Sequence, residues 1–245
     1  MRSVQVLLWL LFLSFSCSVK ENAQTIVDKS ILAHGGDLYE NSIVDFDFRG
    51  RHYTFERNNG LFVYHRIFED SSGTLHDIYS NNGFKRLLNE KEIPVNEEWA
   101  GRYSSSINSV AYFSYLPFGL NDPAVNKNLI GEEEINEKLY YKIRVTFDKE
   151  GGGEDFDDVF VYWISKDTFR MDYFGYSYIS DGGGIRFREA FNTRESNGLV
   201  YSDYINFKDS DDNKNVASLA ELYKSGKLKK LSEIKIENLA IRRYN

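Results

Sequence analysis

Apolar residues alternate with polar residues over most of this chain, and this alternation limits the fold more than any other feature. Val44, Phe46 and Phe48 are each separated by one polar residue, and residues 141–147 repeat the pattern in the second half. Successive side chains on a strand point to opposite faces, so a period of two predicts strands with one face in a core. Aromatic residues make up 16% of the chain, and Tyr and Phe suit pleated, half-buried surfaces. The chain is therefore expected to be mostly β.

Turn residues divide the alternating segments into antiparallel meanders. Asn58-Asn59-Gly60 and Asn81-Asn82-Gly83 predict hairpin turns, because Asn and Gly tolerate a positive φ. Residues 159–164 are apolar on both faces, which predicts a strand that is covered on both sides. About eleven strands are expected, over residues 44–48, 52–56, 61–68, 74–80, 84–88, 141–147, 159–164, 169–173, 185–192, 199–207 and 231–242.

Three segments lack this period and are expected to be helices. Residues 25–34 have apolar side chains near one helical face and end at Gly35-Gly36, which permits a left-handed cap. Residues 97–115 place apolar side chains near helical spacing, and residues 216–224 predict a short third helix. With three prolines and no low-complexity tract, we expect one domain without a linker.

The N-terminus has the features of an export signal that ends at the only cysteine. Arg2 precedes an apolar run over residues 4–13, and Ser16 stands directly before Cys17. The run is shorter than the roughly 20 residues that span a bilayer, so residues 1–16 are expected to be a signal peptide. A cysteine at this place predicts a bacterial lipoprotein whose Cys17 is lipidated and anchors the chain to the membrane. The alternative is an ordinary secretory signal with the same cleavage point.

The residues after Cys17 predict the arrangement of the mature protein. Residues 17–23 would form a lipidated tether and residues 24–245 a single domain. Because Ser18 rather than Asp follows the cysteine, the general retention rule for lipoproteins predicts the outer membrane, with the periplasmic or surface side left open.

Composition and motifs argue against several classes of function. The net charge is −7 and no basic cluster is longer than residues 227–230, which is unfavourable for nucleic-acid binding. No Gly-x-Ser-x-Gly motif exists to supply a nucleophile. The four histidines lack metal-ligand spacing, and the acidic segment at residues 209–213 lacks the glycine and the final Glu of a calcium loop. We expect no catalytic residue, metal or cofactor.

Two segments are unusually rich in aromatic rings, and they supply the candidate ligand-binding residues. These segments are residues 111–118 and 173–178. Packing in a core explains many such rings, but large rings also line apolar pockets. The candidate ligand-binding residues are Tyr112, Phe113, Tyr115, Phe118, Trp163 and Tyr173.

Several of these features together resemble a known superfamily. They are the cysteine after the signal, the helix ending in Ala33-His34-Gly35-Gly36, the strand Phe46-Asp47-Phe48-Arg49 and the order meander, helix, meander. The chain resembles the LolA/LolB superfamily, and more specifically uncharacterised envelope lipoproteins of Gram-negative bacteria, over roughly residues 24–243. The resemblance implies an α+β, mostly β fold: a single antiparallel half-barrel of about eleven strands with a few helices over its concave face.

Three functions follow as alternatives. The resemblance implies a membrane-anchored binder of an apolar ligand such as a lipid or a lipoprotein acyl chain. The second alternative is a hydrolase that uses carboxylates in the cleft, and the third is a structural envelope protein whose barrel is filled by its own side chains. Two carboxylates with raised pKa values in the cavity would favour the hydrolase, whereas an apolar cavity would favour the binder. We also expect Phe46, Phe48, Val145, Phe147, Val161 and Met171 to be buried in one sheet.

Overall fold

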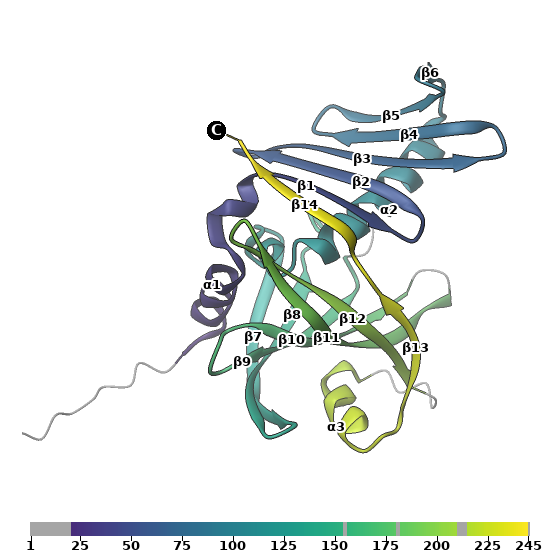
Figure 1. The fold of residues 1–245 in the computed structure, drawn as a ribbon. Helices are drawn as coiled ribbons and strands as arrows, with labels where there is room; N and C mark the ends of the chain where they lie inside the picture. The colour runs from purple at the N-terminus through teal and green to yellow at the C-terminus, as the bar shows by residue number, and fades with distance from the viewer. Residues whose placement is uncertain (1–20, 154–155, 180–181, 210–214, 245) are drawn as a thin grey trace, which may run out of the picture.

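The computed structural model describes residues 21–153, 156–179, 182–209 and 215–244 of the chain. The predicted signal peptide and Cys17 lie outside these residues. Within them, fourteen strands form two antiparallel sheets of seven strands each. Figure 1 shows one sheet above the other, with the helix α2 (Glu97–Ser114) between them.

The first sheet is built from six consecutive strands and one strand from the C-terminal end of the chain. That last strand pairs with β1, so segments almost 200 residues apart in the sequence, such as Val44 and Ile241, lie side by side. In spatial order the sheet consists of β14 (Glu237–Arg243), β1 (Asn41–Phe48), β2 (Arg51–Asn58), β3 (Leu61–Asp70), β4 (Gly73–Ser80), β5 (Gly83–Leu88) and β6 (Lys91–Ile93).

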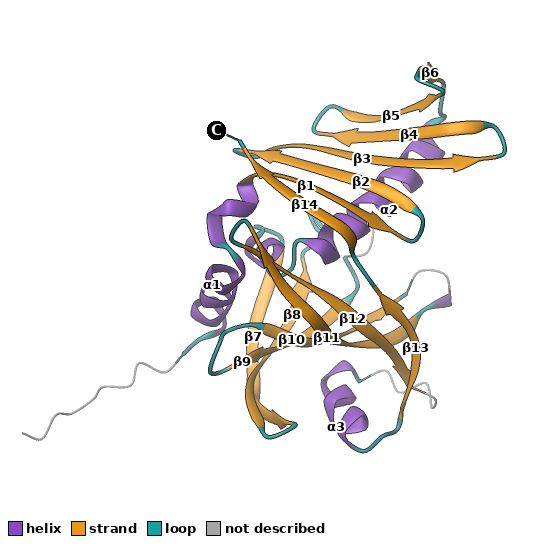
Figure 2. Ribbon diagram, viewed as in Figure 1, coloured by secondary structure: helices purple, strands orange, loops and turns teal. Residues whose placement is uncertain are grey.

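The second sheet is a meander of seven consecutive strands. Its spatial order is β13 (Leu228–Ile234), β12 (Leu199–Asp209), β11 (Gly184–Ser196), β10 (Met171–Tyr178), β9 (Val159–Ser165), β8 (Lys138–Phe147) and β7 (Val125–Ile135). The chain passes from β13 through residues 235–236 directly into β14, and this short link joins the two sheets (Figure 2).

Local sequence fixes the ends of the two longer helices. The side chain of Asn22 accepts a hydrogen bond from the Thr25 backbone N–H before α1 (Ala23–His34), and Asn96 does the same for Trp99 before α2, both at 2.9 Å. These caps satisfy N–H groups that have no partner within the helix. Gly35 has a φ of 129° and ends α1, as the sequence predicts.

The side of each sheet that faces α2 is its inner face, and a hydrophobic cluster lies on each inner face. The inner face of the second sheet packs against α1 and the C-terminal half of α2, through residues that include Ile26, Val27, Ile143, Val145, Tyr162 and Phe174. The inner face of the first sheet packs against α2 through residues that include Val44, Phe46, Phe55, Ile107 and Ala111.

A third cluster covers the outer face of the second sheet. The short helix α3 (Leu219–Lys224) packs there, and Gly175 in β10 permits its close approach, since a Cβ at this position would lie 2.6 Å from Leu219 Cδ1. The strand β9 is therefore buried on both faces, as its sequence predicts.

The expected antiparallel, mostly β fold with helices over the concave side is confirmed, but the number of strands is fourteen rather than about eleven. The sequence does not reveal β6 and β7, and the segment predicted as one strand at residues 231–242 is divided between β13 and β14. The reason for missing β7 is physical: it is an edge strand with mostly exposed residues, and Gly131 interrupts its alternation.

The expectation that six apolar residues are buried in one sheet is wrong. Phe46 and Phe48 belong to the first sheet, and the other four belong to the second. Phe48 and Phe147 are only partly buried, and Val161 packs on the outer face of the second sheet. Pairing between neighbouring strands is local, so the alternation alone does not reveal where one sheet stops and the next begins.

No helix among the described residues is both long enough and apolar enough to cross a membrane.

Candidate functional site

An open cavity of about 320 Å³ lies between α2 and the inner faces of both sheets. Its size is within the range of small-ligand pockets. Every layer of the fold contributes to its lining: Phe46, Phe48 and Arg49 at the end of β1; Ser106, Ser109, Val110, Phe113 and Ser114 on α2; Arg188 on β11; Ser202 and Tyr204 on β12; and Ile234 and Ile236 around the link to β14.

The sequence of α2 explains why space remains beneath it. The lining residues of α2 follow the spacing i, i+3, i+4, i+7 and i+8 from Ser106, so they share one face of the helix. Three of the five are serines, whose small side chains do not fill the gap between the helix and the sheets. The larger Val110 and Phe113 line the space that remains.

Arg188 is the most unusual residue of the lining. It is 8% exposed, and its Nη2 donates a hydrogen bond to Tyr176 Oη at 2.8 Å. Its Nε has no hydrogen-bond partner among the described residues, and no carboxylate in the described part of the chain forms an ion pair with it. Burial lowers the pKa of the guanidinium. Charged side chains are rarely buried without a partner of opposite charge.

Aromatic rings surround the Arg188 guanidinium in place of a carboxylate. Its central carbon lies 4.3 Å from the centre of the Phe113 ring, 5.2 Å from that of Tyr176 and 5.3 Å from that of Phe174. Such rings attract a cation through the negative charge of their faces. They hold the guanidinium in place but leave its positive charge uncompensated.

Two of the predicted ligand-binding residues, Tyr112 and Phe113, lie at cavities. Phe113 lines both the cavity of about 320 Å³ and another of about 130 Å³, which Tyr112 and Phe160 line as well. The first is called the large cavity below because it is the larger of these two. The Tyr112 hydroxyl lies 2.7 Å from the Tyr162 hydroxyl, so Tyr112 attaches α2 to the second sheet.

Tyr115 and Phe118 pack in the cluster of the first sheet. Tyr115 donates a hydrogen bond to the Phe55 carbonyl at 3.4 Å, and Phe118 stacks on Tyr39 with ring centres 5.3 Å apart. Neither residue lines the large cavity.

Trp163 and Tyr173 lie on the outer face of the second sheet, beneath α3. Trp163 Nε1 donates a hydrogen bond to Glu133 Oε2 at 2.9 Å, and the Tyr173 hydroxyl accepts one from Asn136 at 3.3 Å. The structure therefore does not bring the six predicted residues together at one cavity; it distributes them over three clusters.

Sequence reasoning does not identify most of the cavity lining. Arg188 stands in an alternating strand, where an arginine is typical of the solvent face. The signal that could have been used is the stripe of small residues on α2, at Ser106, Ser109 and Ser114, because small residues on the buried side of a helix indicate space.

No carboxylate is found among the described residues that line the large cavity. Burial raises the pKa of two carboxyl groups elsewhere, those of Asp122 and Asp172. Neither lines the large cavity, so they do not form the pair that a hydrolase in this cleft would need.

A buried ionic cluster holds the middle of α2 on the first sheet. Asp77 is fully buried and accepts hydrogen bonds from Arg66 and Arg86 at 2.5–3.0 Å. Arg66 Nη1 also donates to Ser106 Oγ on α2 at 2.9 Å, and the Arg86 guanidinium lies 3.7 Å from the centre of the Tyr103 ring. The charged groups are paired here, in contrast to Arg188.

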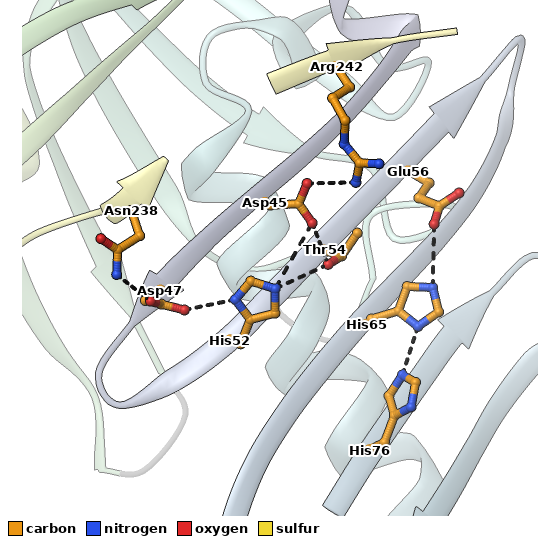
Figure 3. Close-up of polar contacts among 9 residues, drawn as sticks. All are labelled: Asp45, Asp47, His52, Thr54, Glu56, His65, His76, Asn238 and Arg242. Carbon is orange, nitrogen blue, oxygen red and sulfur yellow. Dashed lines mark hydrogen bonds and ion pairs between the residues drawn. The ribbon is translucent and has the colours of Figure 1, made fainter. Parts of the chain in front are cut away.

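The outer face of the first sheet carries polar contacts that fasten β14 to β1 (Figure 3). Arg242 Nη2 donates to Asp45 at 2.8 Å and Asn238 Nδ2 donates to Asp47 at 2.6 Å. His52 Nδ1 lies 2.8 Å from Asp47, but Thr54 donates its hydroxyl to Asp45. The Thr54 hydroxyl also lies 3.5 Å from His52 Nε2 (Figure 3), but it donates its proton to Asp45 at 2.7 Å. The Thr54–His52 contact is therefore not the short hydrogen bond by which a nucleophile passes its proton to a base in a catalytic triad.

Two further histidines on this face, His65 and His76, contact each other. His65 Nδ1 lies 2.8 Å from His76 Nε2, and its other nitrogen lies 3.7 Å from Glu56 (Figure 3). Burial lowers the pKa of both rings, which favours the neutral forms. Within the described ranges, no three His, Cys, Asp or Glu side chains are grouped so as to hold a metal ion.

One comparison with a solved structure supports this architecture. The chain is similar to a LolA superfamily protein from Nitrosomonas europaea, with 11% identity and a TM-score of 0.51, over 92% of this chain and 96% of that one. It is also similar to a putative outer membrane lipoprotein-sorting protein domain from Vibrio parahaemolyticus, with 12% identity and a TM-score of 0.45, over 89% and 91% of the two chains. No curated protein matches the chain in sequence.

The family assignment comes from the sequence itself. Residues 2–238 match a family described as a family of unknown function, DUF6503, and the first structural similarity covers nearly all of both chains. The chain therefore belongs to the DUF6503 family and has a LolA-like fold.

Proposed function

We propose that this protein is an envelope lipoprotein that holds an acyl chain of a lipid or lipoprotein in the cavity beneath α2. The observation that carries the proposal is the cavity itself, which is open, has a volume of about 320 Å³ and is lined mainly by apolar side chains and serines. A filled half-barrel would leave no such space. A hydrolase that uses carboxylates would need them in the cavity, and none of the described lining residues is acidic.

The energy of binding would come from apolar contact area. Each methylene that leaves water contributes about 0.8 kcal/mol. About a dozen methylenes would supply roughly 10 kcal/mol, which is comparable to the estimated cost of association of about 4–15 kcal/mol. The side chains of Phe46, Val110 and Ile236 line the cavity from three different elements and would contact the chain from several sides.

The proposal includes the membrane anchor. Residues 1–16 would be removed as a signal peptide, Cys17 would carry the lipid, and residues 17–23 would tether the domain to the outer membrane. The cavity would then lie within a short distance of a bilayer surface, which is the source of acyl chains.

Native mass spectrometry of the full chain, purified from bacterial envelopes, tests this proposal. We expect a fraction of the protein to carry a non-covalent mass of a lipid, and Ser109→Phe to lose it because the new ring fills the cavity. Arg102→Phe is the matched control, since Arg102 is an exposed residue on the same helix and does not line the cavity.

Two outcomes would contradict the proposal. One is wild-type protein that is free of lipid and remains so after incubation with lipid vesicles. The other is Ser109→Phe that retains as much lipid as the wild type while Arg102→Phe also retains it.

A further inference from the structure

We propose that the ligand of the cavity is a single-chain amphiphile with an anionic head, a carboxylate or a phosphate, and that Arg188 pairs with this head. The inference rests on the proposed function and specifies the chemical class of its ligand.

The first observation is the unsatisfied charge of Arg188. The residue is more than nine-tenths buried, lines the cavity, and forms one side-chain hydrogen bond, to the neutral Tyr176 hydroxyl. Nε has no partner within the described residues. A buried charge without a counter-ion is unfavourable, and a ligand that supplies the counter-charge removes this penalty on binding.

The second observation is the charge of the lining as a whole. Arg49 is the other charged residue of the cavity, and it is exposed, at the turn that follows β1. None of the described lining residues is acidic. The cavity therefore carries two positive charges in a chain whose net charge is −7. This local excess favours an anion over a neutral or cationic ligand.

The third observation is the arrangement of apolar and polar groups. Phe46, Val110 and Ile234 are lining residues that suit a hydrocarbon chain, whereas Arg188 and Ser202 are lining residues that can donate hydrogen bonds. A lining with both kinds of surface matches a molecule with a head and a tail. The volume is near the lower limit of ligand pockets, which favours one chain over two.

The chemistry of the head follows from the guanidinium. Its planar set of N–H donors matches the oxygens of a carboxylate or a phosphate, and such charge-assisted bonds are stronger than neutral ones. The rings of Phe113 and Phe174 hold the guanidinium in a fixed place, so the donors are oriented before the ligand arrives.

Calorimetric titration of the full chain with four probes tests the inference. The probes are dodecanoate, dodecyl phosphate, neutral 1-dodecanol of equal chain length and inorganic phosphate. The two anionic amphiphiles are used below their micellar concentrations and dodecanol below its solubility limit. We expect one or both anionic amphiphiles to bind at least tenfold more tightly than dodecanol, and phosphate alone to bind at least a hundredfold more weakly than they do. The comparison of dodecanoate with dodecyl phosphate identifies the head.

Substitutions test whether Arg188 causes the tighter binding of anionic amphiphiles. Arg188→Met keeps a long side chain without the charge, so it should bind dodecanol as the wild type does and lose the preference for anions. Arg188→Lys keeps the charge and should retain part of the preference for anions. Arg186→Met is the matched control, because Arg186 lies on the same strand two residues away and does not line the cavity; it should keep the wild-type preference. Thermal unfolding of each variant shows whether it is folded.

The possible failures are distinguishable. Equal binding of dodecanol and both anions to the wild type would overturn the inference and leave the proposed function standing. The same holds for a folded Arg188→Met variant that keeps the preference. Tight binding of inorganic phosphate alone would assign the cavity to small anions and overturn the inference. Absence of binding by all four probes would overturn the proposed function as well.

Discussion

The central carbon of the Arg188 guanidinium lies 4.3 Å from the centre of the Phe113 ring, and this contact joins the second sheet to α2 in the wall of the cavity. Arg188 belongs to β11 and Phe113 to α2, and the two residues are 75 positions apart in the chain. The C-terminal half of α2 is held to the second sheet by this contact and by Tyr112 and also packs on the first sheet through Ile107 and Ala111. Tyr103 in its N-terminal half contacts the first sheet through Arg86 of the ionic cluster and through Phe84.

This division predicts that the two halves of α2 can be loosened separately. Phe113→Leu removes the ring from Arg188 and should speed hydrogen exchange of residues 110–114 by about fivefold, corresponding to about 1 kcal/mol of lost cation–π attraction. Phe84→Leu is the matched variant, because Phe84 packs on Tyr103 in the other half of the helix, with ring centres 5.7 Å apart. It should speed exchange of residues 99–103 instead. Equal effects of the two variants on both halves would refute the division.

The ionic cluster predicts a large loss of stability when Asp77 is replaced by an uncharged residue. Asp77→Asn leaves two buried guanidinium groups without their counter-ion, and removal of one partner of a buried pair costs about 3–5 kcal/mol. Chemical denaturation should show a loss of this size in the free energy of unfolding. Glu98→Gln is the control, since Glu98 pairs with Arg102 on the exposed side of α2, where such pairs contribute about 0.3–0.5 kcal/mol. A loss below about 1 kcal/mol for Asp77→Asn would contradict this account.

His34 predicts that stability depends on pH. Burial lowers its pKa to about 4 from an ordinary value of 6.5, and its Nδ1 lies 2.8 Å from the Ser30 carbonyl. The folded state therefore favours the neutral ring. The contribution of neutral His34 to the free energy of unfolding is complete above pH 6.5. It is lost as the pH falls towards 4, because the unfolded state binds the proton at a higher pH than the folded state does. The loss is about 3 kcal/mol.

The measurement is the free energy of unfolding of the wild type and of His34→Gln between pH 7 and pH 4. The glutamine cannot titrate, so the decline should be smaller in the variant by about 3 kcal/mol. The remaining decline includes the contributions of His65 and His76, whose pKa values are also lowered. Identical pH profiles for the two proteins would show that His34 does not contribute.

The predicted lipid anchor at Cys17 implies that its removal releases the protein from the membrane. Cys17→Ala removes the thiol that would be acylated, so the variant should lose its acyl modification and leave the membrane fraction. Ser18→Asp is the informative companion, because it should keep the acylation and move the protein to the inner membrane. Stable anchoring of mature Cys17→Ala in the membrane fraction would contradict the predicted lipidation.

The sequence predicts the local structure of this protein better than its assembly. Hairpins such as the one at Asn58-Asn59-Gly60 follow from the turn residues and the alternation that flanks them. The pairing of β14 with β1 does not, because it joins Ile241 to Val44 across the whole chain. The division into two sheets depends on this pairing and is therefore not visible in any local pattern.

The candidate site shows the same limit. Tyr112 and Phe113 lie on α2 and contact the second sheet, whereas Tyr115 follows the helix as its C-cap and contacts the first sheet. On β9, which is apolar on both faces, the sequence does not reveal which residues face α2. The structure places Tyr162 on the inner face and Trp163 on the outer face, whereas the predicted ligand-binding residues include Trp163 and not Tyr162.

The most direct test of the acyl-chain proposal is the location of a bound chain. Intermolecular nuclear Overhauser effects between 13C-labelled dodecanoate and the methyl groups of the full chain measure it. The account predicts contacts with Val110, Ile234 and Ile236, which line the cavity, and none with Ile185 or Leu219 on the outer face of the second sheet. Contacts confined to the outer-face methyl groups, or none to the cavity methyl groups at saturating dodecanoate, would contradict the claim that this cavity holds an acyl chain.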